Sequence, residues 1–166
     1  EAYYAQLRQE FTALLENDSV FYHFQPLFSA RDGHVVAYEA LMRVNMPLLR
    51  SPETIMKLAH EENRLYDIEH LTLFKGTQTF ERLVSCGKLS PDAKLFINSI
   101  ASIALPREDS EYMDSRWHEL RRQMVIEITE EEAKAKYNKG AGELKSTYEV
   151  WGPKLILSEY YDKYFY

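Results

Sequence analysis

Three polar side chains interrupt strand-like apolar runs of the sequence, and together they have the chemistry to hold a divalent cation. Glu39 lies in "VAYEALMRV", Asn98 in "KLFINS" and Glu127 in "MVIEIT". Taken singly, each is explained by an exposed strand edge or by pairing with a nearby lysine. Buried without a partner, even a neutral polar group costs about 2–7 kcal/mol, and a carboxylate costs more. Their shared place near strand ends is typical of an α/β active site, and their oxygens suit Mg²⁺ or Mn²⁺ better than zinc.

Arg43 follows Glu39 by four residues in the same strand-like run. Alternate side chains of a strand share a face, so these two are expected on the same side of a sheet. An arginine beside an oxygen-ligand cation site is a two-pronged donor for a phosphate. A plain Glu39–Arg43 ion pair is the alternative, and the sequence leaves both interpretations open.

The composition narrows the class of protein. The chain has 166 residues, of which 45% are apolar, and this suits one globular domain or a large part of one. A net charge of −6 and only small basic clusters argue against DNA or RNA as a partner. No apolar run is long enough to enter a membrane. The first residues do not resemble a secretory signal, and Cys86 is the one cysteine, so a cytoplasmic protein is expected.

Apolar periodicity and turn residues predict the elements that position these side chains. The expected helices cover residues 3–16, 51–60, 65–84 and 110–122, with another beginning at "EEEAKAK". An antiparallel pair of strands is expected at 21–29 and 34–44, joined by the turn "RDG". The short apolar runs at 94–99, 124–129 and 154–157 are typical of parallel strands buried on both faces. This alternation of strands and helices predicts an α/β sheet.

Three motifs then resemble one family. The segment "FQPLFSARDGHVVAYEALMRV" resembles the opening of the EAL domain, the bacterial cyclic di-GMP phosphodiesterase, and "LFINSIAS" and "VIEITE" resemble two of its later strands. The resemblance implies an incomplete EAL-type (β/α) TIM-like barrel whose first strand is antiparallel. It also implies metal-dependent hydrolysis of cyclic di-GMP, with Mg²⁺ or Mn²⁺ as the cofactor.

The resemblance also implies a role for individual residues. Glu39, Asn98 and Glu127 would be metal ligands, Arg43 would hold a phosphate, and Gln25 would lie beside the ligand. Glu130 would be the second glutamate of its strand, which steadies an active-site loop in the family. These roles agree with the chemistry expected from the residues alone.

The sequence departs from the family near its end. Where the family has Asp-Asp-Phe-Gly, this chain has Ser158 and Glu159 followed by two tyrosines. We therefore expect impaired hydrolysis in this chain, and the alternative is a non-catalytic module that binds cyclic di-GMP or protein partners. The expected organisation is an N-terminal helix or linker at 1–20 and the N-terminal two thirds of an EAL-like domain at 21–166. A homo-oligomer is expected, and a sensor or GGDEF domain fused to this one is compatible with the family.

Overall fold

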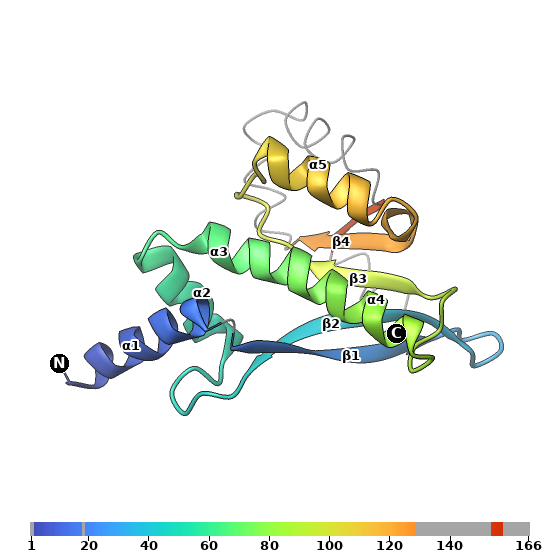
Figure 1. Ribbon diagram of the computed structural model, residues 1–166. Helices are drawn as coiled ribbons and strands as arrows, with labels where there is room; N and C mark the ends of the chain where they lie inside the picture. The colour runs from blue at the N-terminus through green and yellow to red at the C-terminus, as the bar shows by residue number, and fades with distance from the viewer. Residues whose placement is uncertain (1, 18, 129–153, 158–166) are drawn as a thin grey trace.

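The computed structural model describes residues 2–17, 19–128 and 154–157 of the chain (Figure 1). Its elements, in chain order, are α1 (Ala2–Glu16), β1 (Val20–Phe28), β2 (Val35–Val44), α2 (Pro52–Glu61), α3 (Leu65–His70), the π-helical turn η1 (Leu71–Lys75), α4 (Gly76–Ser85), β3 (Lys94–Asn98), α5 (Arg107–Arg116), the 3₁₀ turn η2 (Leu120–Gln123), β4 (Met124–Ile128) and β5 (Lys154–Leu157). None of the helices within these ranges is long and apolar enough to cross a membrane.

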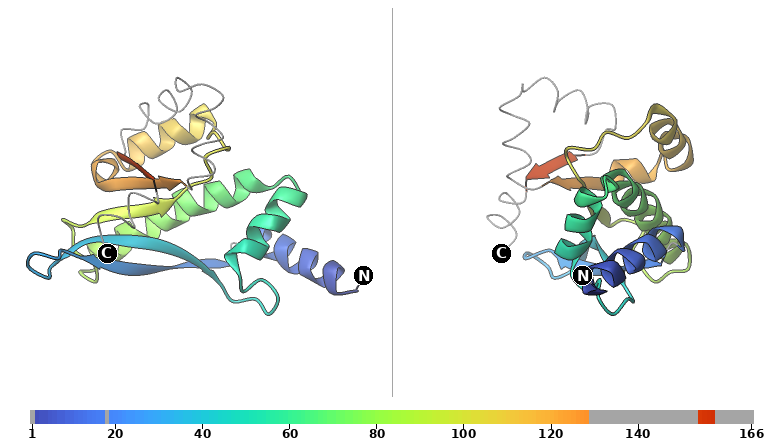
Figure 2. Two further views of the ribbon diagram at one scale, coloured as in Figure 1. Left: turned by 180° about the vertical axis from the view of Figure 1, so that it is seen from behind. Right: turned by 90° about the vertical axis from the view of Figure 1, so that its left-hand side faces the viewer.

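The five strands form one sheet in the order β1-β2-β3-β4-β5. β1 runs antiparallel to β2, and the remaining neighbours are parallel. Among the described residues the sheet does not close on itself, since β1 and β5 are its two edges. Helices α4 and α5 lie on the same side of it (Figure 2). The predicted α/β fold, an incomplete barrel with an antiparallel first strand, is confirmed.

The two faces of the sheet carry different side chains, because successive residues of a strand point to opposite sides. The face under the helices belongs to the main hydrophobic core, which includes Tyr38 and Ala40 of β2, Leu95 and Ile97 of β3, and Ile126 of β4. The opposite face holds a small apolar cluster of Ala37, Phe96 and Val125. Two positions further along the same strands, on this second face, come Glu39, Asn98 and Glu127. The polar trio therefore stands on a floor of small and apolar residues.

Helix α1 belongs to the packed structure. It buries Leu7, Phe11 and Leu14 in the main core. The Glu10 carboxylate accepts a hydrogen bond from the backbone N–H of Leu48 at 2.9 Å. These contacts fix the helix against the segment that leads from β2 into α2.

Two predicted helices differ from the observed ones. The helix expected at 65–84 contains the π turn Leu71–Lys75, which divides it into α3 and α4. A 3.6-residue apolar repeat carries no signal for one wider turn. The helix expected at 110–122 instead begins at Arg107, directly after Pro106, and ends at Arg116. The 3₁₀ turn η2 follows it at Leu120–Gln123. The sequence of α5 is mostly polar, so it offers few buried side chains from which to predict its bounds. The helix expected after residue 130 lies outside the described residues.

Thr77 in α4 offers a test of core packing. Its side chain is fully buried, and its hydroxyl finds no hydrogen-bond partner among the described residues. Valine has nearly the same shape and no polar atom. We expect Thr77→Val to raise the free energy of unfolding by about 1 kcal/mol, because an unsatisfied buried hydroxyl costs about 1–3 kcal/mol. Urea unfolding of the two chains measures this, and a lower free energy of unfolding in the variant would contradict the packing described here.

Candidate functional site

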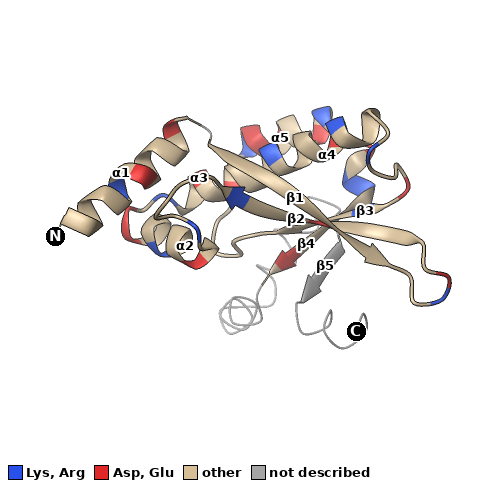
Figure 3. Ribbon diagram, turned by 90° about the horizontal axis from the view of Figure 1, so that it is seen from below, with Lys and Arg blue, Asp and Glu red and all other residues tan. Residues whose placement is uncertain are grey.

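The ends of β2, β3 and β4 bring the three predicted cation ligands together. In the sheet register Glu39 lies opposite Phe96, and Asn98 lies opposite Glu127. The Asn98 amide nitrogen Nδ2 donates a hydrogen bond to Glu39 Oε1 at 3.2 Å. Asn98 thus stands between two carboxylates on the second face of the sheet. In Figure 3 the end of β4 is coloured as acidic and the end of β2 as basic.

Glu127 is the electrostatically strained member of the trio. Its side chain is buried, with the whole residue 7% exposed, and its carboxylate makes no hydrogen bond or ion pair with the described residues. Burial, and to a lesser extent the negative charge of Glu39, together raise the pKa of Glu127 from 4.5 to about 7. Two carboxylates that repel each other, with an amide between them, fit a hard divalent cation, which would neutralise both.

The three candidate cation ligands combine carboxylate and amide oxygens. Among the described residues no group of three or more histidine, cysteine, aspartate or glutamate side chains is suitably placed for a metal ion. The set at the strand ends has two carboxylates, Glu39 and Glu127, and one amide, Asn98. Oxygen donors of this kind select Mg²⁺ or Mn²⁺ rather than zinc.

The raised pKa of Glu127 predicts how stability depends on pH. Because the folded-state pKa lies above the unfolded value of 4.5, protonation of Glu127 favours the folded chain at low pH. This contribution is complete below the unfolded pKa and is lost as the pH rises through about 7. We therefore expect the metal-free Glu127→Gln variant to gain stability relative to the unchanged chain as the pH rises, most steeply between these two values. Urea unfolding across this range measures the difference, and a flat difference would contradict the assignment.

A cavity of about 490 Å³ opens beside these residues, between the strand ends and helices α2 and α3. Its polar lining includes Arg43, Glu53, Glu69, Asn98 and Glu127, and much of the rest is apolar. Ligand sites typically have this size and this mixture of an apolar wall with a few polar groups. The cavity is therefore the best candidate for a binding site in the described part of the chain.

Arg43 lines the cavity and does not pair with Glu39. Its Nη1 donates a hydrogen bond to the Met42 carbonyl at 2.8 Å. No ion pair joins Arg43 to an acidic side chain in the described ranges, so the Glu39–Arg43 ion pair left open by the sequence is wrong for this structure. An arginine has five N–H donors, and the remaining ones are available to an anion in the cavity.

The other residues named from the sequence are placed as follows. Gln25 of β1 lies directly opposite Glu39 in the antiparallel register, so the two side chains share a face. It is exposed there. Glu130, Ser158 and Glu159 lie outside the described residues.

Glu69 of α3 is the site residue that sequence reasoning missed. It is 2% exposed, lines the cavity and accepts hydrogen bonds from Ser99 and Ile100. In the sequence it is one glutamate in "LYDIEH", beside the inward-facing Ile68. The only signal would have been its position next to the buried stripe of the helix, since its partners lie thirty residues away.

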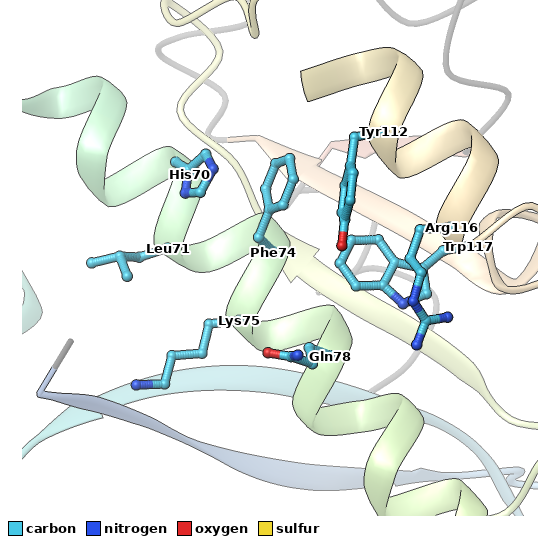
Figure 4. Close-up of a pocket in the computed structure, with 8 residues that line it drawn as sticks. All are labelled: His70, Leu71, Phe74, Lys75, Gln78, Tyr112, Arg116 and Trp117. Atoms are coloured by element: carbon cyan, nitrogen blue, oxygen red, sulfur yellow. The ribbon is translucent and has the colours of Figure 1, made fainter. Parts of the chain in front are cut away.

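A second, smaller pocket of about 210 Å³ lies among α3, α4 and α5 (Figure 4). His70 stacks on Phe74 with ring centroids 4.1 Å apart, and Tyr112 stacks on the same ring at 5.8 Å. Arg116 donates through its two terminal nitrogens, Nη1 and Nη2, to the two carboxylate oxygens of Glu81, each at 2.7 Å. These contacts attach α5 to the consecutive helical segments α3, η1 and α4. We interpret the pocket as part of that packing.

Sequence comparison identifies the family. A model of the EAL domain matches residues 6–147. The chain belongs to the EAL domain family. A comparison with curated protein sequences gives no match.

Solved EAL structures are similar to this chain in fold. "PaMucR Phosphodiesterase, c-di-GMP complex" has a TM-score of 0.74 at 19% identity over 90% of this chain and 62% of that one. The FimX EAL domain from Pseudomonas aeruginosa, bound to c-di-GMP, gives 0.66 at 20% identity over 91% and 61%. Klebsiella pneumoniae BlrP1, in a calcium/cy-diGMP complex, gives 0.59 at 19% over 82% and 34%. The chain therefore spans less than two thirds of the length of each of these EAL structures.

Proposed function

We propose that this EAL domain binds a divalent cation and cyclic di-GMP in the cavity at the ends of β2, β3 and β4. The observation that carries the proposal is the meeting of Glu39, Asn98 and Glu127, with the pKa of Glu127 raised by burial and by Glu39. This arrangement is electrostatically unfavourable without a cation. Its residues are those that the EAL resemblance names as metal ligands.

The cation would be Mg²⁺ or Mn²⁺. Glu39 and Glu127 would each supply a carboxylate oxygen, and Asn98 would supply its amide oxygen Oδ1. When bound, such a cation polarises a phosphodiester and neutralises charge that develops on it. The apolar floor of Ala37, Phe96 and Val125 excludes water from beneath the trio and so strengthens each electrostatic interaction above it.

The nucleotide would be held mainly by Arg43. Its planar guanidinium matches two phosphate oxygens at once, and it lines the same cavity as Asn98 and Glu127. Gln25, on the same face opposite Glu39, would contact the ligand from the β1 side. The volume of about 490 Å³ is large enough to enclose a substantial part of a dinucleotide. Cyclic di-GMP is the ligand in the solved PaMucR and FimX complexes.

The residues that replace the family's aspartate pair bear on whether this chain hydrolyses cyclic di-GMP. Ser158 and Glu159 stand where the family's pair of aspartates is expected, and a serine hydroxyl is a poor replacement for a carboxylate ligand. We infer that the 166-residue chain binds cyclic di-GMP but turns it over slowly or not at all. In this respect it would act as a binding module in signal transduction.

A turnover assay tests this inference. Cyclic di-GMP is incubated with the chain and Mn²⁺, and formation of the linear dinucleotide is followed beside the Glu39→Ala variant. We expect little or no product from either chain. Robust product formation that disappears in Glu39→Ala would contradict impaired hydrolysis while supporting the proposed cation site.

Assembly and neighbouring domains are also part of the proposal. β1 is an edge of the described sheet and exposes Phe21 and Phe28, which supports self-association into a homo-oligomer. Helix α1 packs with the domain through Leu7, Phe11 and Leu14, so a sensor or GGDEF domain would be joined on the N-terminal side of α1.

A further inference from the structure

Glu69 is a buried carboxylate whose two oxygens hold the same short segment. Ser99 Oγ donates to Oε1 at 2.5 Å, and the backbone N–H of Ile100 donates to Oε2 at 2.8 Å. The residue is 2% exposed and lies in α3, more than a full strand and a loop away in sequence from these donors. Because one buried carboxyl group binds two consecutive residues, α3 fixes the position of residues 99–100.

That segment directly follows Asn98, the central member of the cation site. On its other side, the backbone N–H of Ser99 donates to the Glu127 carbonyl at 2.8 Å. Residues 98–100 are thus bonded to β4 in one direction and to α3 in the other. These bonds determine where the Asn98 amide stands between Glu39 and Glu127.

Stability alone gives a weak reason for a carboxylate at this place. Burying a carboxyl group costs free energy, which its hydrogen bonds from Ser99 and Ile100 offset. Ile100 and Ala101 are themselves buried and would keep the segment against the core. A site that binds a cation has a stricter requirement, because its ligands must be held to within about 0.5 Å of a productive geometry.

We propose that Glu69 is a positioning residue for the cation site, which holds residues 98–100 so that Asn98 presents its amide oxygen between the two carboxylates. This inference rests on the proposed function, since it assumes that Glu39, Asn98 and Glu127 bind a cation. Glu69 acts through Ser99 and Ile100 rather than by touching the cation. Loss of a residue that orients a metal ligand typically lowers metal affinity about 10- to 100-fold.

Three variants separate positioning from folding. Glu69→Leu removes both acceptors and should weaken Mn²⁺ binding about 10- to 100-fold. Glu69→Gln keeps an oxygen for the Ile100 N–H and an amide that donates to Ser99 Oγ, so it should retain an intermediate affinity. Phe80→Leu is the matched control, because Phe80 is fully buried in α4 and does not line the cavity. It should lower stability and leave Mn²⁺ affinity unchanged.

The experiment is a titration of the full 166-residue chain with Mn²⁺, followed by electron paramagnetic resonance, with folding checked by circular dichroism. If Glu69→Leu does not fold, Ser99→Ala replaces it, because it removes one of the two bonds and should weaken binding several-fold. Wild-type affinity in folded Glu69→Leu or in Ser99→Ala would overturn this inference alone. An unchanged chain that binds no Mn²⁺ would overturn the proposed function and this inference with it.

Discussion

Replacing Glu39 with alanine is expected to lower the Mn²⁺ affinity of the chain by more than about 100-fold, beyond the effect typical of a residue that only orients a ligand. The variant loses one carboxylate ligand and the acceptor of the Asn98 amide hydrogen bond. It also removes the charge that helps to raise the pKa of Glu127, so this pKa should move down toward 4.5. Isothermal titration calorimetry with Mn²⁺ measures the affinity.

Glu39→Gln is the matched variant for this prediction. It keeps an oxygen beside Asn98 but has no charge, so its Mn²⁺ affinity should lie between those of the unchanged chain and Glu39→Ala. In the absence of metal, relief of the repulsion with Glu127 should keep this variant at least as stable as the unchanged chain above pH 7, where Glu127 is ionised. A large loss of stability in metal-free Glu39→Gln would mean that Glu39 is a structural residue.

Replacing Arg43 with alanine is expected to weaken cyclic di-GMP binding about 10- to 100-fold, since a hydrogen bond to a charged group contributes about 1.5–3 kcal/mol and 1.4 kcal/mol is tenfold. Mn²⁺ affinity in the absence of nucleotide should not change, because Arg43 bonds only the Met42 carbonyl among the described residues. Calorimetric titrations with Mn²⁺ and with the nucleotide measure the two affinities separately.

Arg43→Lys distinguishes a planar fork from a simple positive charge. Lysine keeps the charge but loses paired donation to two phosphate oxygens, so its nucleotide affinity should fall by nearly as much as that of the alanine variant. Equal nucleotide binding by Arg43→Ala and the unchanged chain would remove Arg43 from the site. A parallel loss of Mn²⁺ binding would instead indicate that Arg43 supports the fold of the strand ends.

Most of the fold was predictable because its signals are local. The turn "RDG" between two strand-like runs predicted the β1–β2 pair, and the continuous apolar runs predicted the parallel strands β3, β4 and β5. The π turn Leu71–Lys75 was not predictable, because apolar periodicity is the same with or without one wider turn. The start of α5 was missed because only Met113 in that helix is buried.

The candidate site was predictable as far as strand geometry determines it. Alternation along β2 correctly placed Glu39 and Arg43 on one face, and strand ends brought Asn98 beside Glu127. Whether Arg43 would pair with Glu39 depends on side-chain rotamers, which sequence spacing does not determine. Glu69 was missed for a similar reason. Its role follows from contacts with Ser99 and Ile100, and these exist only after α3 has packed against the end of β3.

The most direct test of the cation site is a crystal structure of the chain grown or soaked with Mn²⁺, with data collected for anomalous scattering from the metal. The account predicts an anomalous peak between Glu39, Asn98 and Glu127, with their oxygens within about 2.0–2.6 Å of it. It also predicts that the Asn98 amide turns its oxygen toward the peak, away from the orientation in which Nδ2 donates to Glu39. A peak elsewhere, or no peak at these three residues in crystals that take up Mn²⁺, would contradict the account.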